Sequence, residues 1–177
     1  AFLSQNTIVG KSVDTPIKNL NRSSGGALKK YRIAIAAASD YAEFHGGTVS
    51  GTLSAIVTTL NRVTGIYENE LSITFELVDD NDKIIYIDVA NDPYNGKSTD
   101  ATLSINQTNV DEVIGNGNYD IEHVFTTGSG GLAGLGVVCR SSSKARGTTG
   151  ISSPQGDPFD VDFVAHEIGH QFGANHT

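Results

Sequence analysis

Apolar residues along the chain follow two different periods, one typical of strands and one typical of helices. Apolar and small residues alternate over 31–38, and apolar and polar residues alternate over 71–78, as expected for buried or half-buried strands. Between these segments, apolar residues recur every three or four positions over 49–64, which predicts one long amphipathic helix. Gly65 is a plausible end for that helix, because glycine readily adopts the left-handed conformation that closes many helices.

The second half of the chain continues to alternate between the two patterns. Residues 84–87 have β character, residues 99–114 predict a helix that ends at Gly115, and residues 119–125 predict another buried strand. The glycine-rich segment 128–131 is expected to turn the chain into an edge strand over 132–138. Strands that alternate with helices predict an α/β fold with a twisted, mostly parallel sheet and crossover helices.

The 177 residues suit one domain with a tail. Residues 1–28 have the polar, glycine-containing composition of a tail or spacer, and residues 29–177 contain the patterned segments. The net charge of −8 argues against nucleic acid or an anionic membrane as the main partner. No apolar run approaches the roughly 20 residues needed to span a bilayer, so we expect no membrane partner.

The residues with the strongest chemical potential lie together at the C-terminal end of the chain. Asp157 and Pro158 predict the start of a helix there. On that helix His166 and His170 lie one turn apart, a rise of about 6 Å, so both imidazoles can reach a single Zn²⁺. The complete pattern is His166-Glu167-Ile168-Gly169-His170-Gln171-Phe172-Gly173-Ala174-Asn175-His176.

Gly173 explains how a third ligand can reach the same ion. Because glycine has no Cβ, it can take a left-handed conformation that ends the helix and swings His176 back towards the metal. Three histidines with one open position are the arrangement of a catalytic zinc ion. Glu167, beside the first ligand, is placed to accept a proton from the water at that position and to pass it to a leaving amine.

A simpler interpretation is that His166 and His170 are ordinary histidines on an amphipathic helix. The glutamate, the helix-ending glycine and the third histidine argue against it, because each meets a separate need of a catalytic zinc site. His45 and His123 have no such neighbours in the sequence, and we expect them to be packing or surface histidines.

The eleven-residue pattern resembles that of the metzincin metallopeptidases, and the preceding residues are similar to their reprolysin or adamalysin-like branch, most of all to secreted bacterial members. The resemblance implies an α+β metzincin-like fold, with an antiparallel edge strand beside the zinc-binding active-site helix. It also implies a secreted zinc endopeptidase that hydrolyses internal peptide bonds. The upstream similarity runs through Gly131, Leu132, Ala133, Gly136, Cys139 and the segments 144–150 and 163–165.

The resemblance further implies that a protein or peptide substrate lies extended along Gly131, Leu132 and Ala133 and adds a strand through main-chain hydrogen bonds. A flexible glycine loop is the alternative for these residues. Residues 29–177 would then be the N-terminal lobe of the catalytic domain, and a C-terminal lobe with a Met-containing turn would continue past Thr177. A calcium ion is possible, but no pattern in the sequence indicates its site.

Cys139 is the single cysteine of the chain. From the sequence alone it could be a buried thiol, which is the default, a reactive thiol or half of a disulfide bridge. The family resemblance implies the third of these, with a partner cysteine beyond Thr177.

Two other functions remain open. The chain could be a zinc-stabilised binding or adhesion module without turnover, or an inactive fragment of a peptidase. Glu167 favours the enzyme, because a purely structural zinc site has no use for a general base beside an open coordination position.

Overall fold

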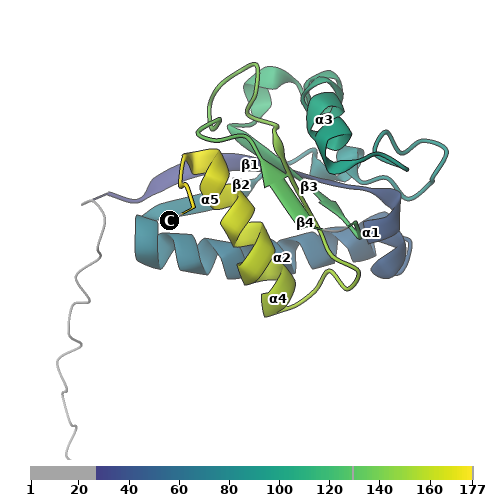
Figure 1. Cartoon of the computed structure of the whole chain (residues 1–177), viewed down its shortest axis with the longest axis horizontal. Coiled ribbons are helices and arrows are strands. Elements are labelled where there is room, and N and C mark those ends of the chain that lie inside the picture. Colours follow the sequence, from purple (N-terminus) through teal and green to yellow (C-terminus); the bar gives the residue numbers. More distant parts are fainter. Residues whose placement is uncertain (1–26, 129, 177) are drawn as a thin grey trace, which may run out of the picture.

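A five-stranded sheet organises the computed structural model, which describes residues 27–128 and 130–176 (Figure 1). The strand order is β2-β1-β3-β5-β4, and all neighbours are parallel except β4 and β5, which are antiparallel. The predicted fold class, a mostly parallel sheet with an antiparallel edge strand, is therefore confirmed. The strands are β1 (Lys29–Ala37), β2 (Ile73–Leu77), β3 (Ile121–Thr126), β4 (Gly130–Ala133) and β5 (Gly147–Gly150).

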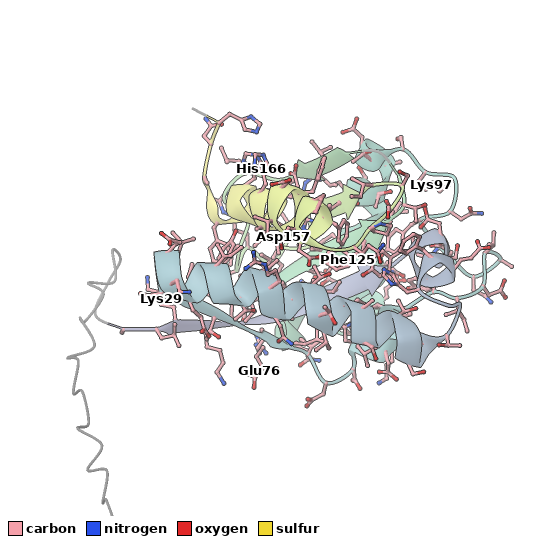
Figure 2. The ribbon with its side chains drawn as sticks, turned by 90° about the horizontal axis from the view of Figure 1, so that it is seen from below. Lys29, Glu76, Lys97, Phe125, Asp157 and His166 are labelled. Carbon is pink, nitrogen blue, oxygen red and sulfur yellow. The ribbon has the colours of Figure 1, made fainter. Side chains whose placement is uncertain are left out.

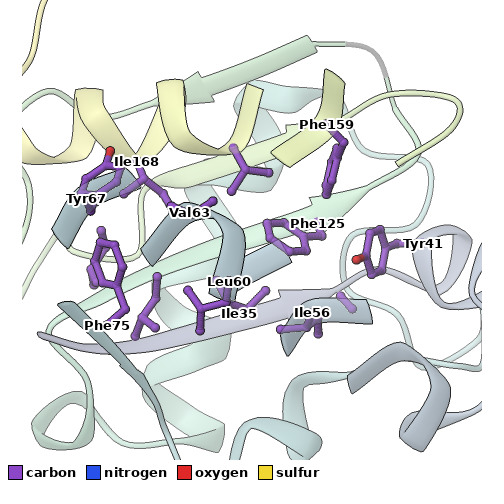
Figure 3. Close-up of a cluster of buried hydrophobic side chains, with 14 of the residues drawn as sticks. Ile35, Tyr41, Ile56, Leu60, Val63, Tyr67, Phe75, Phe125, Phe159 and Ile168 are labelled. Atoms are coloured by element: carbon purple, nitrogen blue, oxygen red, sulfur yellow. The ribbon is translucent and has the colours of Figure 1, made fainter. Parts of the chain in front are cut away.

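Helices cover both faces of this sheet (Figure 1). The long helix α2 (Val49–Leu71) and the C-terminal helices pack on one face, and α3 (Thr99–Val113) packs on the other. The short helix α1 (Ser39–Phe44) follows β1 directly. Figure 3 shows the larger of the two cores, which lies between the sheet, α2 and the C-terminal helix and includes Ile35, Ile56, Val63, Phe125, Phe159 and Ile168.

The alternation within β1 supplies both cores at once. Ile33 and Ile35 face α2, whereas Ala34 and Ala36 face α3, and all four residues are fully buried. A strand that is buried on both faces is typical of the centre of a parallel sheet.

Helix α2 does not end at Gly65 as predicted but continues to Leu71, where Ser72 closes it in a left-handed conformation (φ 54°). The reason lies two residues beyond the glycine. Tyr67 is buried against the C-terminal helix, and its hydroxyl donates to the carbonyl of Ala165 at 2.8 Å. A glycine inside a helix costs about 1 kcal/mol, which is less than the burial of a large aromatic side chain contributes.

The strand predicted over 84–87 is also wrong. Residues Asn81–Ile84 form a 3₁₀ helix, and Ile85 makes only an isolated bridge to Ala37. The side chain of Asn81 forms the hydrogen bonds with β1 that a neighbouring strand would otherwise form. Its oxygen accepts from Ile35 N at 2.7 Å, and its amide nitrogen donates to Ile35 O at 3.0 Å.

The edge of the sheet differs from the predicted strand over 132–138. Strand β4 is Gly130–Ala133, and the chain then leaves the sheet through a loop in which Gly136 (φ 63°) and Cys139 (φ 62°) are left-handed. Strand β5 was missed altogether, because Gly-Thr-Thr-Gly carries no apolar alternation.

Residues 1–26 lie outside the described residues, so the spacer predicted over 1–28 stays a prediction. Among the residues that the structure does describe, no helix is both long enough and apolar enough to cross a bilayer.

Two adjacent ionisable residues of β3 are fully buried. The carboxyl of Glu122 contacts the amide of Asn106 and accepts from Ala36 N at 3.3 Å. Burial raises the pKa of Glu122 well above its usual range and lowers the pKa of His123 to about 4. His123 is thus a packing histidine, as expected, and the fold favours the neutral form of both side chains. His45 is half-buried, with Nε2 3.1 Å from the carbonyl of Pro154.

Glu122→Gln is expected to make stability rise more steeply with pH. Above about pH 4.5 the unfolded chain loses a Glu122 proton that the native chain keeps, and below about pH 6.5 it holds a His123 proton that the native chain lacks. Where both differences apply, the two contributions to the pH dependence of stability oppose each other. In the variant only the contribution of His123 remains, and it gives the unfolded state one more bound proton than the native state. Above about pH 4.5, in the range where both contributions act in the wild type, the free energy of unfolding of the variant should then rise by up to about 1.4 kcal/mol per pH unit more than that of the wild type. Urea unfolding at a series of pH values tests this, and equal slopes for the two proteins would contradict it.

Candidate metal centre and active site

The helix that carries the histidines is continuous from Asp157 to Phe172 but irregular in its middle. It consists of α4 (Asp157–Phe159), a π-helical segment (Asp160–Ala165) and α5 (His166–Phe172). Pro158 lies in the first turn, as expected, but the N-cap is Gly156 and not Asp157. The carboxylate of Asp157 instead pairs with Arg62 of α2 at 2.8 Å.

This helix is anchored to α2 by apolar and polar contacts. Val164 and Ile168 enter the larger core. Asp160, which is buried, accepts a hydrogen bond from the hydroxyl of Thr59 at 2.7 Å, and burial raises its pKa. Figure 2 shows His166 on the side of the helix that faces away from α2. One side of the helix therefore packs against the core, and the other side carries the candidate ligand His166.

The structure brings the three predicted ligands together. Nε2 of His166 lies 3.0 Å from Nε2 of His170 and 3.1 Å from Nε2 of His176, and the last two are 3.1 Å apart. Nitrogen ligands 2.0–2.1 Å from a tetrahedral zinc ion lie roughly 3.3–3.4 Å from one another. The spacing of the three nitrogens thus fits one zinc ion, and the group is positioned to bind a metal.

A second contact of His170 determines which of its nitrogens faces the other rings. Nδ1 lies 2.7 Å from the carbonyl oxygen of Ala174. Because a carbonyl can only accept, Nδ1 carries the proton, and Nε2 directs a lone pair towards the other two histidines. Metal-binding histidines are commonly oriented by a contact of this kind.

Gly173 ends the helix as the sequence predicts. Its φ of 103° is left-handed, and its N–H donates to the carbonyl of His170 at 2.8 Å. The N–H of Ala174 then donates to Gly169 O at 2.9 Å. This turn reverses the chain and brings His176 next to the two histidines of α5.

Glu167 lies between the histidines and strand β4. Its side chain is only 8% exposed, and burial raises its pKa while the three histidines act in the opposite direction. Gly131 lies directly beneath it, since a Cβ at that position would be only 2.6 Å from Glu167 Cδ. A hollow of about 240 Å³ joins the site and is lined by Gly131, Leu132, Ala133, Leu135, Glu167, His170, Asn175 and His176.

Cys139 is exposed and free, so the default expectation of a buried thiol is wrong. Its N–H donates to Asp120 O at 2.8 Å in the loop that follows β4. The disulfide to a cysteine beyond Thr177 stays a prediction.

Two residues near the site were missed by sequence reasoning. Gln171 is fully buried and hydrogen-bonded to β3, and Gly147 of β5 lies directly against it. No local pattern in the sequence marks either residue. Gln171 is one of the unspecified positions between the histidines, and Gly147 lies in a strand without apolar alternation.

The class of protein follows from how this helix and turn are placed on the sheet. A helix that presents two histidines and a glutamate beside an antiparallel edge strand, with a glycine turn that returns a third histidine, is the arrangement of a metzincin metallopeptidase. Residues 53–177 match the model of the metallo-peptidase family M12B reprolysin-like. This match covers more than half of the chain, which therefore belongs to that zinc-dependent family. No curated protein matches the chain.

Gly131→Ala should destabilise the protein by about 1–3 kcal/mol, because the added methyl group overlaps the side chain of Glu167 and displaces that side chain, α5 or β4. Urea unfolding of the purified variant measures the loss. Gly65→Ala is the matched control, since a Cβ there meets nothing within 4 Å in the exposed middle of α2. The control should be about 0.5–1 kcal/mol more stable than the wild type. Equal stability of the two variants would contradict the close approach at Gly131.

Proposed function

We propose that the chain is a zinc-dependent endopeptidase, with His166, His170 and His176 as zinc ligands and Glu167 as general base. The observation that supports this proposal most strongly is the hollow that Glu167 shares with the histidines and the edge strand. A structural metal site needs no carboxylate beside an open coordination position. A zinc-stabilised binding module would have no use for that placement.

Zinc at this site would lower the pKa of a bound water and polarise the carbonyl of the scissile peptide bond. The chain's own residues do the rest. A carboxylate oxygen of Glu167 takes the proton of the attacking water and delivers it to the leaving amine. The burial of Glu167 favours this role, because a raised pKa brings proton uptake closer to neutral pH.

Strand β4 is proposed to hold the substrate. It lies at the edge of the sheet, with β5 on one side only, so its other main-chain edge can pair with an extended peptide. The missing side chain of Gly131 and the small side chain of Ala133 would allow the peptide to lie close to Glu167. Leu132 completes the segment of β4 that lines the hollow.

We further propose a C-terminal lobe after Thr177 that forms the opposite wall of the cleft. A second hollow of about 430 Å³, lined by Ala165, His166, Gly169, His170, Ala174, Asn175 and His176 but by no residue of β4, supports a partner on that side. A location outside the cell stays a prediction from the resemblance to secreted family members.

Metal removal and two substitutions test the proposed roles. The purified protein should carry one zinc ion, and a chelator should abolish peptidase activity until zinc is restored. His170→Ala should lose both zinc and activity. Glu167→Gln should keep its zinc but lose about 10²–10⁴-fold in kcat, since only proton transfer is removed. Metal analysis together with a quenched-fluorescence peptide assay separates the two effects, and a Glu167→Gln variant with wild-type turnover per zinc would refute the assignment.

A peptide blocked at both ends distinguishes an endopeptidase from an exopeptidase. An acetylated and amidated peptide should be cut internally, because recognition along β4 uses the main chain and requires no free terminus. Mass spectrometry of the products locates the cleaved bond. Cleavage of unblocked peptides alone would show that the protein is not an endopeptidase.

A further inference from the structure

Gln171 connects the zinc-binding helix to the centre of the sheet. Its side chain is fully buried, and its amide donates to the main-chain carbonyl of Glu122 at 2.7 Å. Its side-chain oxygen lies 2.9 Å from Nδ1 of His123. Both partners belong to β3, so a single side chain spans the distance from α5 to the middle strand.

The direction of these hydrogen bonds is fully determined. Because Glu122 O can only accept, the amide nitrogen of Gln171 must point to it, and the amide oxygen then accepts from Nδ1–H of His123. The other ring nitrogen of His123 accepts from the hydroxyl of Thr149 at 2.7 Å. A buried chain with one consistent set of donors and acceptors tolerates little movement, since any shift leaves a buried polar group unpaired.

The same face of α5 carries Glu167 and Gln171, one turn apart, and each lies over a glycine. Glu167 lies over Gly131 of β4, and Gln171 lies over Gly147 of β5, where a Cβ would be 2.6 Å from Gln171 Cδ. In the sheet Gly147 pairs with Ala133, which lies two residues after Gly131 in β4. The amide of Gln171 and the carboxylate of Glu167 are therefore held on adjacent strands by the same close approach.

The loop that follows β4 also holds the end of α5. The loop after β4 donates from Gly136 N to His170 O at 3.0 Å and from Val137 N to Gln171 O at 2.8 Å. Main-chain and side-chain contacts thus converge on the turn that contains the second histidine.

We propose that Gln171 and His123 are a positioning pair that sets the rotation of α5 against the sheet, and with it the placement of His170 and Glu167 beside β4. The part of this inference that concerns turnover rests on the proposed peptidase function, whereas the part that concerns metal geometry rests only on the three histidines. Neither Gln171 nor His123 lines the hollow of the site, so both act through α5.

Two substitutions of His123 form a matched test. In His123→Asn the side-chain amide can take the place of Nδ1 and keep the contact with Gln171, whereas in His123→Gln it takes the place of Nε2 and keeps only the contact with Thr149. We expect His123→Gln to lower kcat about 10–100-fold with KM within about twofold. His123→Asn should stay within about threefold of the wild-type kcat. Equal kcat values for the two variants would overturn the proposal.

Gln171→Leu tests the other partner, with Asn81→Leu as control. Asn81 is a similarly buried amide that bonds the main chain of Ile35, away from α5. Both variants should lose stability in urea. Only Gln171→Leu should lose kcat per folded, zinc-loaded molecule, and an equal loss in Asn81→Leu would show that the effect is general destabilisation.

Metal binding provides a measurement that does not depend on peptidase activity. Zinc affinity, measured by competition with a chromogenic chelator, should fall about tenfold or more in Gln171→Leu and His123→Gln and stay near wild type in His123→Asn and Asn81→Leu. The visible absorption of the Co²⁺-loaded protein, which reports on ligand geometry, should change in the same two variants only. A wild-type protein that binds zinc but cleaves no peptide would refute the proposed function and leave this comparison intact. Unchanged affinity and spectra in all four variants would refute the positioning pair.

Discussion

The site depends on how closely the helix α5 approaches strands β4 and β5. Two glycines make that approach possible, because a methyl group at Gly131 or Gly147 would occupy the space of Glu167 or Gln171. A helix held farther away would separate the carboxylate from the edge strand and would leave the amide of Gln171 short of β3. The placement of the Glu167 carboxylate thus depends on the absence of a side chain at both glycines.

The zinc helix also depends on α2 for its support. Phe159, Val164 and Ile168 pack into the larger core, while Tyr67 and Thr59 of α2 bond to the main chain of Ala165 and to Asp160. This support explains why α2 continues past Gly65, since its last turns lie under the metal-binding segment. The helix that carries His166, Glu167 and His170 therefore belongs to the same packing unit as the core.

The sequence predicted those parts of the protein that produce a pattern among neighbouring residues. The alternation in β1 and the periodicity of α2 and α3 reflect direct burial, and Gly173 with its three histidines reflects the needs of one metal ion. Strand β5 and the true extent of β4 could not be predicted, because Gly and Thr in these strands are chosen by contacts with Glu167, Gln171 and His123. The hydrogen bond between Thr149 and His123, for example, joins positions 26 residues apart, and no local pattern can reveal such a contact. Asn81 was missed for a similar reason, since a side chain there satisfies the main chain of a strand.

The loop that follows β4 has a mechanical consequence. Its N–H groups donate to the carbonyls of His170 and Gln171 near the end of α5, so the strand that would receive a peptide is tied to the helix that would hold the metal. A peptide pairing with β4 therefore meets a surface that is already in register with Glu167, and the loss of conformational freedom on binding falls almost wholly on the peptide. In a cleft of this kind, discrimination between peptides would arise from how readily each of them becomes extended.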